Sequence, residues 1–179
     1  MTQVLPKKAE RQLDFAEGMV LSFKSQKFDL AALPDRSYPD LTQGSSIISL
    51  LNENDDTLLM IIFRRAQNKI FLFDHASKCI GDGFGIERSV DLNPMDVTRW
   101  GESGVTISVH HYSTGSGFGR YQILFNLTTI CHFDKIFAGR ATRVRRSCSG
   151  TSLDDELSFY SYKISALRPE ERQAILSGM

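Results

Sequence analysis

The stretch that decides the fold runs from Leu50 to Asp74 and reads LLNENDDTLLMIIFRRAQNKIFLFD. It holds two apolar runs, Leu58–Phe63 and Ile70–Phe73, which we predict as strands. The polar turn Asn52–Asp56 precedes the first run, and Ala66–Asn68 separates the two. Short apolar runs bounded by turn residues are typical of β-strands. The stretch therefore predicts strands joined by tight turns, as in an antiparallel sheet.

The same pattern repeats on both sides of this stretch. Gly83–Leu92, GFGIERSVDL, is a second β-rich stretch. Further strands are predicted at Met19–Phe23, Ile47–Leu51, Val105–His111, Tyr121–Phe125, Thr129–Phe133, Ala141–Arg146 and Leu157–Ile164. Many short strands at this spacing favour an all-β, antiparallel β-sandwich.

Helix is scarce in this sequence. The one helix we expect is Leu167–Leu176, because Pro169 suits its first turn and acidic residues follow directly. Lys7–Phe15 is only weakly amphipathic. The Pro-containing segment Ala32–Gln43 is expected to be a surface loop.

Length and charge exclude several classes of protein. The 179 residues suffice for one domain with a well-buried core. Lys plus Arg number 21 and Asp plus Glu number 21, so the net charge is zero and predicts no binding to nucleic acid. No apolar run is long enough to span a bilayer, so we expect no membrane insertion. The N-terminal sequence lacks the apolar region of a secretory signal.

Cysteine and histidine spacing predicts neither a disulfide framework, nor a metal site, nor a cofactor. Cys79, Cys131 and Cys148 are odd in number and form no CxxC pair, which indicates reduced thiols. His110 and His111 would point to opposite faces of one strand, which does not suit a shared metal ion. No nucleophile motif is present, so the sequence does not predict an enzyme.

Three residues on the two β-rich stretches have the chemistry that a sugar requires. Arg64 offers a planar fork of donors, Glu87 an acceptor and Phe84 a flat aromatic face. Planar polar groups hydrogen-bond adjacent hydroxyls, and aromatic rings cover the C–H face of a pyranose. On the residues alone the alternative stays open, with Phe84 in the core and the charges at solvated strand ends.

Two further features have structural interpretations. Arg140, Arg143, Arg145 and Arg146 form a local basic run, in which Arg143 and Arg145 would share one strand face. A solvated face or an interface with acidic side chains is the expected role, and an anionic glycan or phosphate is the alternative. Asn126 is expected in a hairpin turn rather than as a used glycosylation site.

Three stretches between about Gly18 and Ile164 carry a resemblance to a known family. LLNENDDTLLMIIFRR looks like the strand pair holding a His-x-x-x-Arg signature, and GDGFGIERSV looks like a Trp-Gly-x-Glu-x-Arg segment. GRYQILFNLTTICHFDKIFAGRATRVR is similar to the family's later hairpin. On these stretches the chain resembles the galectins, and most closely the fungal galectins.

The resemblance implies a carbohydrate site with departures from the family's pattern. Its members would be Arg64, Glu87, Phe84 in place of the stacking tryptophan, Met60 in place of the histidine, and Asp74 near the position of an asparagine. Arg88 follows Glu87 directly, so the second arginine is shifted by one and Ser89 occupies its place. Met60 cannot donate the bond that reads the axial hydroxyl of galactose, a bond worth about 0.5–1.5 kcal/mol.

The resemblance also implies architecture, function and location. It divides the chain into an N-terminal extension (1–17), a galectin-like carbohydrate-recognition domain of jelly-roll type (18–166) and a C-terminal helical tail (167–179). It implies a non-enzymatic lectin for β-galactosides or related glycans, forming homo-oligomers, made in the cytoplasm and exported without a signal peptide. The loss at Met60 predicts altered specificity, for example toward N-acetylglucosamine-containing chains. The alternative is a galectin-fold interaction or structural module without sugar binding.

Overall fold

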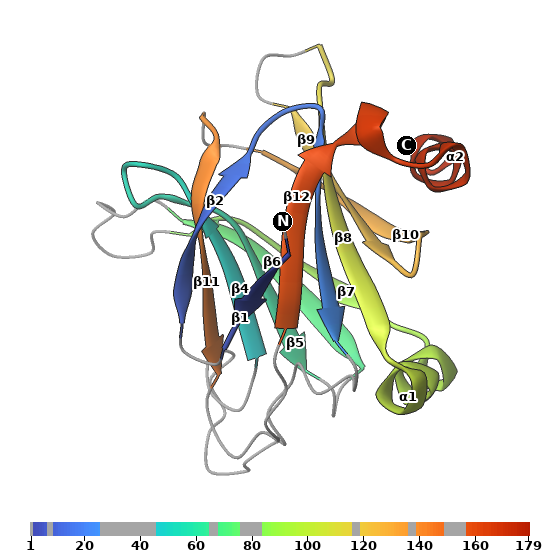
Figure 1. Cartoon of the computed structure of the whole chain (residues 1–179). Helices are drawn as coiled ribbons and strands as arrows, with labels where there is room; N and C mark the ends of the chain where they lie inside the picture. The colour runs from blue at the N-terminus through green and yellow to red at the C-terminus, as the bar shows by residue number, and fades with distance from the viewer. Residues whose placement is uncertain are drawn as a thin grey trace, which may run out of the picture.

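The computed structural model is a sandwich of two six-stranded antiparallel sheets (Figure 1). It describes residues 2–6, 9–25, 46–64, 68–75, 84–115, 119–135, 139–148 and 157–179. Sheet A has the strand order β1-β12-β3-β8-β9-β10, and sheet B has the order β2-β11-β4-β5-β6-β7. The all-β sandwich and its C-terminal helix confirm the predicted fold class.

Runs of consecutive strands belong to one sheet, with β4 to β7 in sheet B and β8 to β10 in sheet A. Sheet A contains β1 (Gln3–Leu5), β3 (Met19–Ser25), β8 (Val105–Tyr112), β9 (Arg120–Phe125), β10 (Thr128–Asp134) and β12 (Leu157–Lys163). Sheet B contains β2 (Glu10–Phe15), β4 (Ser46–Leu51), β5 (Thr57–Arg64), β6 (Lys69–His75), β7 (Phe84–Asp91) and β11 (Ala141–Cys148). Two helices, α1 (Pro94–Ser103) and α2 (Pro169–Ser177), lie near opposite ends of the sandwich in Figure 1.

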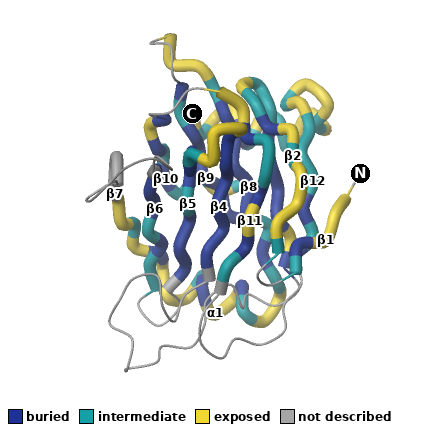
Figure 2. Tube along the Cα trace, turned by 90° about the vertical axis from the view of Figure 1, so that its left-hand side faces the viewer, coloured by how far each residue is buried: buried dark blue, intermediate teal, exposed yellow. Residues whose placement is uncertain are grey.

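The main core fills the space between the sheets. Figure 2 shows buried residues along the middle strands, such as β4 and β5, and exposed residues along much of β2. Aromatic rings from both sheets meet here, with the Phe63 and Phe125 centroids 5.8 Å apart. Trp100 of α1 packs edge-on against Phe125 at 5.0 Å, so α1 covers one end of this core.

Helix α1 was not predicted from the sequence. The Asn93 side chain accepts from the Met95 backbone N–H at 2.9 Å, and Pro94 begins the helix. Only Val97 and Trp100 of α1 are buried. Two apolar residues with helical spacing are too weak a pattern to separate such a short helix from a loop.

The other predicted elements agree with the structure. Each predicted strand overlaps an observed strand, and α2 confirms the predicted Leu167–Leu176 helix, with Ile164–Ala166 forming a 3₁₀ turn before it. Asn126 and Leu127 form the β9–β10 turn with φ of 49° and 65°, which confirms the hairpin turn at Asn126.

The N-terminal residues contribute two strands that the sequence did not predict. β1 pairs with β12, and β2 pairs with β11, so each adds one strand to a different sheet. The division into extension, recognition domain and tail remains a prediction. The predicted loop Ala32–Gln43 lies outside the described residues.

Candidate functional site

The outer face of sheet B, which points away from sheet A, is organised in rows by the strand register. Ser49 pairs with Met60, Met60 with Phe73, and Phe73 with the backbone of Glu87. In the next row Ile47, Ile62, Phe71 and Ser89 follow one another across β4 to β7. Side chains in register on neighbouring strands lie on the same face, so these residues form one surface.

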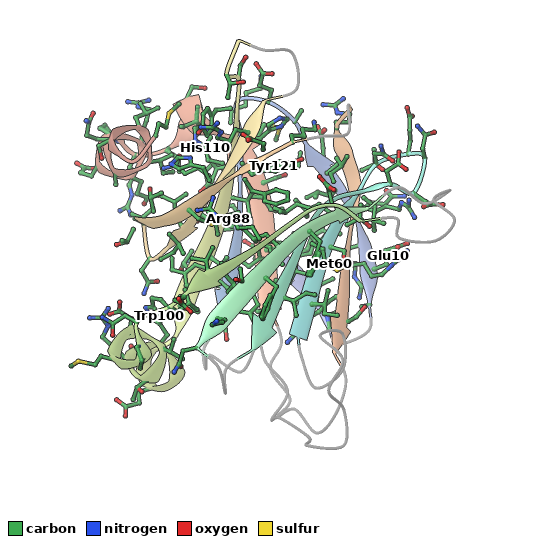
Figure 3. The ribbon with its side chains drawn as sticks, turned by 180° about the vertical axis from the view of Figure 1, so that it is seen from behind. Glu10, Met60, Arg88, Trp100, His110 and Tyr121 are labelled. Carbon is green, nitrogen blue, oxygen red and sulfur yellow. The ribbon has the colours of Figure 1, made fainter. Side chains whose placement is uncertain are left out.

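The centre of this face is an apolar cluster separate from the main core. Ile47, Ile62 and Phe73 are buried, and Met60 and Phe71 are partly buried and pack against them. Ile62 is only 1% exposed even though it points away from the space between the sheets. We call these five residues the sheet B cluster. In Figure 3 the labelled Met60 and Glu10 lie on sheet B, and the labelled His110 lies on sheet A beside α2.

Three of the predicted site residues can be placed only by their backbone. The side chains of Arg64, Phe84 and Glu87 lie outside the described residues. Arg64 pairs with Lys69, which in turn pairs with Asp91. The register therefore sets Arg64 two rows, or about 13 Å along the strand, from the row that contains Met60 and Glu87.

Asp74 and Arg88 have described side chains, and both point away from this face. The pairing of β6 with β5 and with β7 is irregular near Asp74, and the extra residue lies on β5 in one case and on β7 in the other. Side chains of β6 therefore alternate regularly between the two faces, and Asp74 lies on the face opposite Phe73. Asp74 is 0% exposed. Arg88 Nη1 donates to the backbone carbonyl of His132 on sheet A at 2.6 Å, so its guanidinium crosses between the open edges of the two sheets.

The basic run flanks the same face and is paired with acidic groups. Arg143 forms ion pairs with Asp55 and Glu10. Arg145 Nη2 lies 2.9 Å from Glu10 Oε1, and Arg140 Nη2 lies 2.8 Å from an Asp14 oxygen. These pairs confirm the expected role for Arg140, Arg143 and Arg145.

Arg146 belongs to the basic run by sequence and not by position. It points to the other face of β11, is 1% exposed and donates to the Leu5 carbonyl at 3.2 Å. Arg146 therefore helps to hold β1 and is not part of the surface charge.

A polar network that was not predicted from the sequence lies on the outer face of sheet A. His110 Nδ1 lies 2.9 Å from Gln122 Oε1, and Gln122 Nε2 donates to Thr129 Oγ1 at 2.8 Å and to the Ile175 carbonyl at 2.9 Å. Ile175 of α2 packs with Val20 and Leu124 on the same face. The network and the apolar contacts together dock α2 on sheet A.

A second bridge anchors the end of this helix. His132 Nδ1 lies 2.8 Å from the Tyr112 hydroxyl, and His132 Nε2 lies 3.1 Å from the Gly178 carbonyl. A Cβ added at Gly178 would clash with Thr129 Oγ1 and Gln122 Nε2. The signal that could have revealed this face is the alternation of polar residues with core residues along β3, β8 and β9.

Burial controls the titration of the groups near these faces. It lowers the pKa of His110, against a raising effect of the Gln122 hydrogen bond and a further lowering by His132. It raises the pKa of the Cys131 thiol to about 11, with Arg88 acting in the opposite direction. The Cys131 thiol is therefore protonated near neutral pH and a poor nucleophile.

Within the described ranges, no group of three or more His, Cys, Asp or Glu side chains is placed to hold a metal ion. Among these residues, no helix is long and apolar enough to cross a membrane. Surfaces built from apolar, aromatic and hydroxyl groups suit non-covalent binding.

Comparisons with known proteins give the fold. No protein-family model matches the sequence, and no curated protein matches it. Among solved structures, the Caenorhabditis elegans galectin LEC-6 is similar, with a TM-score of 0.60, 13% identity, and coverage of 90% of this chain and 95% of that one.

Two mammalian structures are also similar. Sheep galectin-11, in complex with glycerol, has a TM-score of 0.55 and 11% identity, covering 88% of this chain and 99% of that one. A variant of human galectin-16 has a TM-score of 0.54 and 8% identity, covering 87% and 95% of the respective chains. The sandwich is therefore a galectin-like fold, as the resemblance implied.

Proposed function

We propose that this protein is a non-enzymatic lectin that binds glycans on the outer face of sheet B, with a specificity that differs from that of ordinary galectins. The observation that carries the proposal is the sheet B cluster, in which Met60 and Phe71 are partly exposed above the buried Phe73. An apolar and aromatic platform suits the C–H face of a pyranose ring.

The same platform favours N-acetylated sugars. The methyl group of an N-acetyl substituent is apolar and would be buried against Met60 or Phe71, which stabilises the complex by the area removed from water. Met60 cannot donate the hydrogen bond that distinguishes galactose from glucose. We therefore propose glycans that contain N-acetylglucosamine as preferred ligands, in line with the predicted shift in specificity.

The polar part of the proposed site comes from the resemblance. Arg64 would donate to two hydroxyls at once, and Glu87 would accept from a hydroxyl in the row of Met60. Phe84 would add a second aromatic face further along β7. Asp74 and Arg88 are left out of this proposal, because Asp74 is fully buried and Arg88 bonds to His132 on the other sheet.

A glycan array on the purified protein tests this function, with variants of two arginines, Arg64 and Arg88. Arg64→Ala should abolish binding to the best ligand, with about 1.5–3 kcal/mol lost from charge-assisted hydrogen bonds. Arg64→Lys should not restore binding, because an ammonium lacks the planar fork. Arg88→Ala should retain binding. Equal binding by wild type and Arg64→Ala would contradict the role of Arg64.

A galectin-fold interaction module without sugar binding is the second candidate function. The observation that favours it is the lack of polar groups in the two central rows, where only Ser49 and Ser89 are polar among the described side chains of β4 to β7. If the folded protein binds no glycan on the array, the interaction module is favoured over the lectin.

The assembly and location of the protein follow from the same proposal. We propose a homo-oligomer, because β1 and β10 of sheet A and β2 and β7 of sheet B end their sheets, and such edges favour pairing with another chain. We propose cytoplasmic synthesis and non-classical secretion to the cell exterior, in keeping with the resemblance to galectins. Light scattering that gives a monomer mass at working concentration would contradict the oligomer.

A further inference from the structure

Small hydroxyl side chains form the floor of a groove on the outer face of sheet A. Ser22 of β3 pairs with Ser108 of β8, and their Oγ atoms lie 2.9 Å apart. In the next row Lys24 pairs with Thr106. Ser22, Ser108 and Thr106 have short side chains, so the surface of the sheet is recessed at this point.

Larger residues stand on both sides of this floor. On β12 the rings of Tyr160 and Tyr162 stack with centroids 4.9 Å apart, and the Tyr162 hydroxyl lies 3.0 Å from Ser22 Oγ. On the other side stand Asn126 and Leu127 of the β9–β10 turn, and Glu171 of α2 closes one end. Together they enclose a cavity of about 290 Å³.

The groove continues along the sheet away from α2. A second cavity of about 590 Å³ shares Lys24, Thr106 and Asn126 with the first one. Its other lining residues include Ser158 of β12 and Gly104, directly after α1. Cavities of a few hundred Å³ with few and well-placed polar groups are the usual size of ligand sites.

The charges along the groove argue against an anionic polymer. Lys24 is exposed, and the carboxylate of Glu171 stands at the opposite end of the first cavity, where it pairs with Arg168. A phosphate chain would meet this carboxylate, whereas a neutral ligand can use both charges as hydrogen-bonding groups. Hydroxyls, an amide, two tyrosine rings and the apolar Leu127 complete the lining.

We propose that this groove is a second saccharide site, which takes a neutral oligosaccharide on the face opposite the sheet B cluster. The ring of Tyr160 stacks on a pyranose, the Asn126 amide and Lys24 ammonium donate to hydroxyls, and the Thr106 hydroxyl bonds at the floor. The site shares no residue with the sheet B cluster, so the inference does not depend on the proposed function. Two sites on opposite faces would let a single chain bridge two glycans.

Amide proton–nitrogen correlation spectra recorded during titration test this site. The probes are N,N′-diacetylchitobiose, lactose and maltose, each raised to millimolar concentration. The amides of Lys24, Thr106 and Asn126 report on the groove, and those of Met60 and Phe71 report on the sheet B cluster. Shifts at the groove amides with at least one probe would support the site, whether or not the sheet B amides move. Shifts confined to the sheet B amides, or no shifts at all, would overturn it.

Matched variants establish which side chains bind the probe. Tyr160→Ala should weaken binding at the groove by roughly tenfold, and Tyr160→Phe, which keeps the ring, by less than about twofold. Lys24→Ala should weaken binding severalfold. Lys163→Ala, at an exposed lysine outside the groove lining, should leave it unchanged. If the probe still shifts the groove amides of Tyr160→Ala, with the same affinity as in wild type, the proposal is overturned.

Discussion

The outer faces of the two sheets differ in what covers their middle strands. On sheet A, α2 docks over β8 and β9 through Ile175 and Gln122, and the uncovered part of the face is lined by hydroxyl groups. On sheet B, the middle strands present the sheet B cluster, with partly exposed Met60 and Phe71. The polar residues of sheet A next to α2 hold this helix on the sheet. The apolar residues of sheet B lie on the face where we expect ligand binding.

The largest expected effect is on the sheet A side, at Gln122. Gln122→Leu should lower the free energy of unfolding by about 3 kcal/mol, because it removes bonds to His110, Thr129 and the Ile175 carbonyl and leaves buried groups unsatisfied. Urea denaturation measures this loss. Thr129→Val, which removes one of these bonds, should cost about 1 kcal/mol. Equal stability of wild type and Gln122→Leu would contradict the docking of α2.

A smaller effect is expected at Met60, as a gain of binding. Met60→His would restore the donor that reads an axial hydroxyl, so lactose affinity should rise roughly two- to tenfold, corresponding to about 0.5–1.5 kcal/mol. Calorimetric titration of both proteins with lactose measures the change. Met60→Leu, which adds no donor, is the control. A gain in Met60→Leu as large as in Met60→His would mean that the histidine donor is not its cause.

The sheet A network should also make stability depend on pH. Burial lowers the pKa of His110 in the folded protein, so the unfolded chain takes up this proton first as the pH falls. The contribution of His110 is therefore present above its unfolded pKa of about 6.5 and is lost as the pH falls toward the folded pKa. His110→Gln should show a shallower fall in the free energy of unfolding between about pH 7.5 and about pH 5. Parallel curves for the two proteins would contradict this.

The smallest effect is expected at the rim of the sheet B face. Arg145→Ala removes an exposed pair with Glu10 and should change the free energy of unfolding by less than about 1 kcal/mol. Glycan affinity should stay the same, because the sheet B cluster does not include Arg145. Denaturation and array binding check the two statements. A loss of glycan binding would extend the site from the cluster to the basic run.

Much of the sandwich could be predicted from the sequence, because its strands have strong local signals. The runs Leu58–Phe63 and Ile70–Phe73 are apolar, short and bounded by turns, and they became β5 and β6. β1 and β2 were missed because their burial depends on partners far along the chain, β12 and β11. A segment such as ERQLDF has no strand pattern of its own.

The site was harder to predict, because it depends on register. The extra residues in β5 and β7 determine which residues of neighbouring strands lie side by side. No local signal in the sequence gives the positions of these extra residues. Asp74 was a predicted site residue and is fully buried. Phe71 and Ile62 were not predicted as site residues and lie in the sheet B cluster. Strand periodicity alone does not reveal which face of a doubly apolar strand is the outer one.

We propose above all that the sheet B cluster binds N-acetylated glycans. Calorimetric titration with triacetylchitotriose, on wild type and Phe71→Ala, tests it most directly. We predict measurable binding by wild type and an affinity at least roughly tenfold lower in Phe71→Ala, because the aromatic platform is lost. The groove variant Tyr160→Ala should retain the Phe71-dependent binding. Equal affinity of wild type and a folded Phe71→Ala variant would contradict the claim.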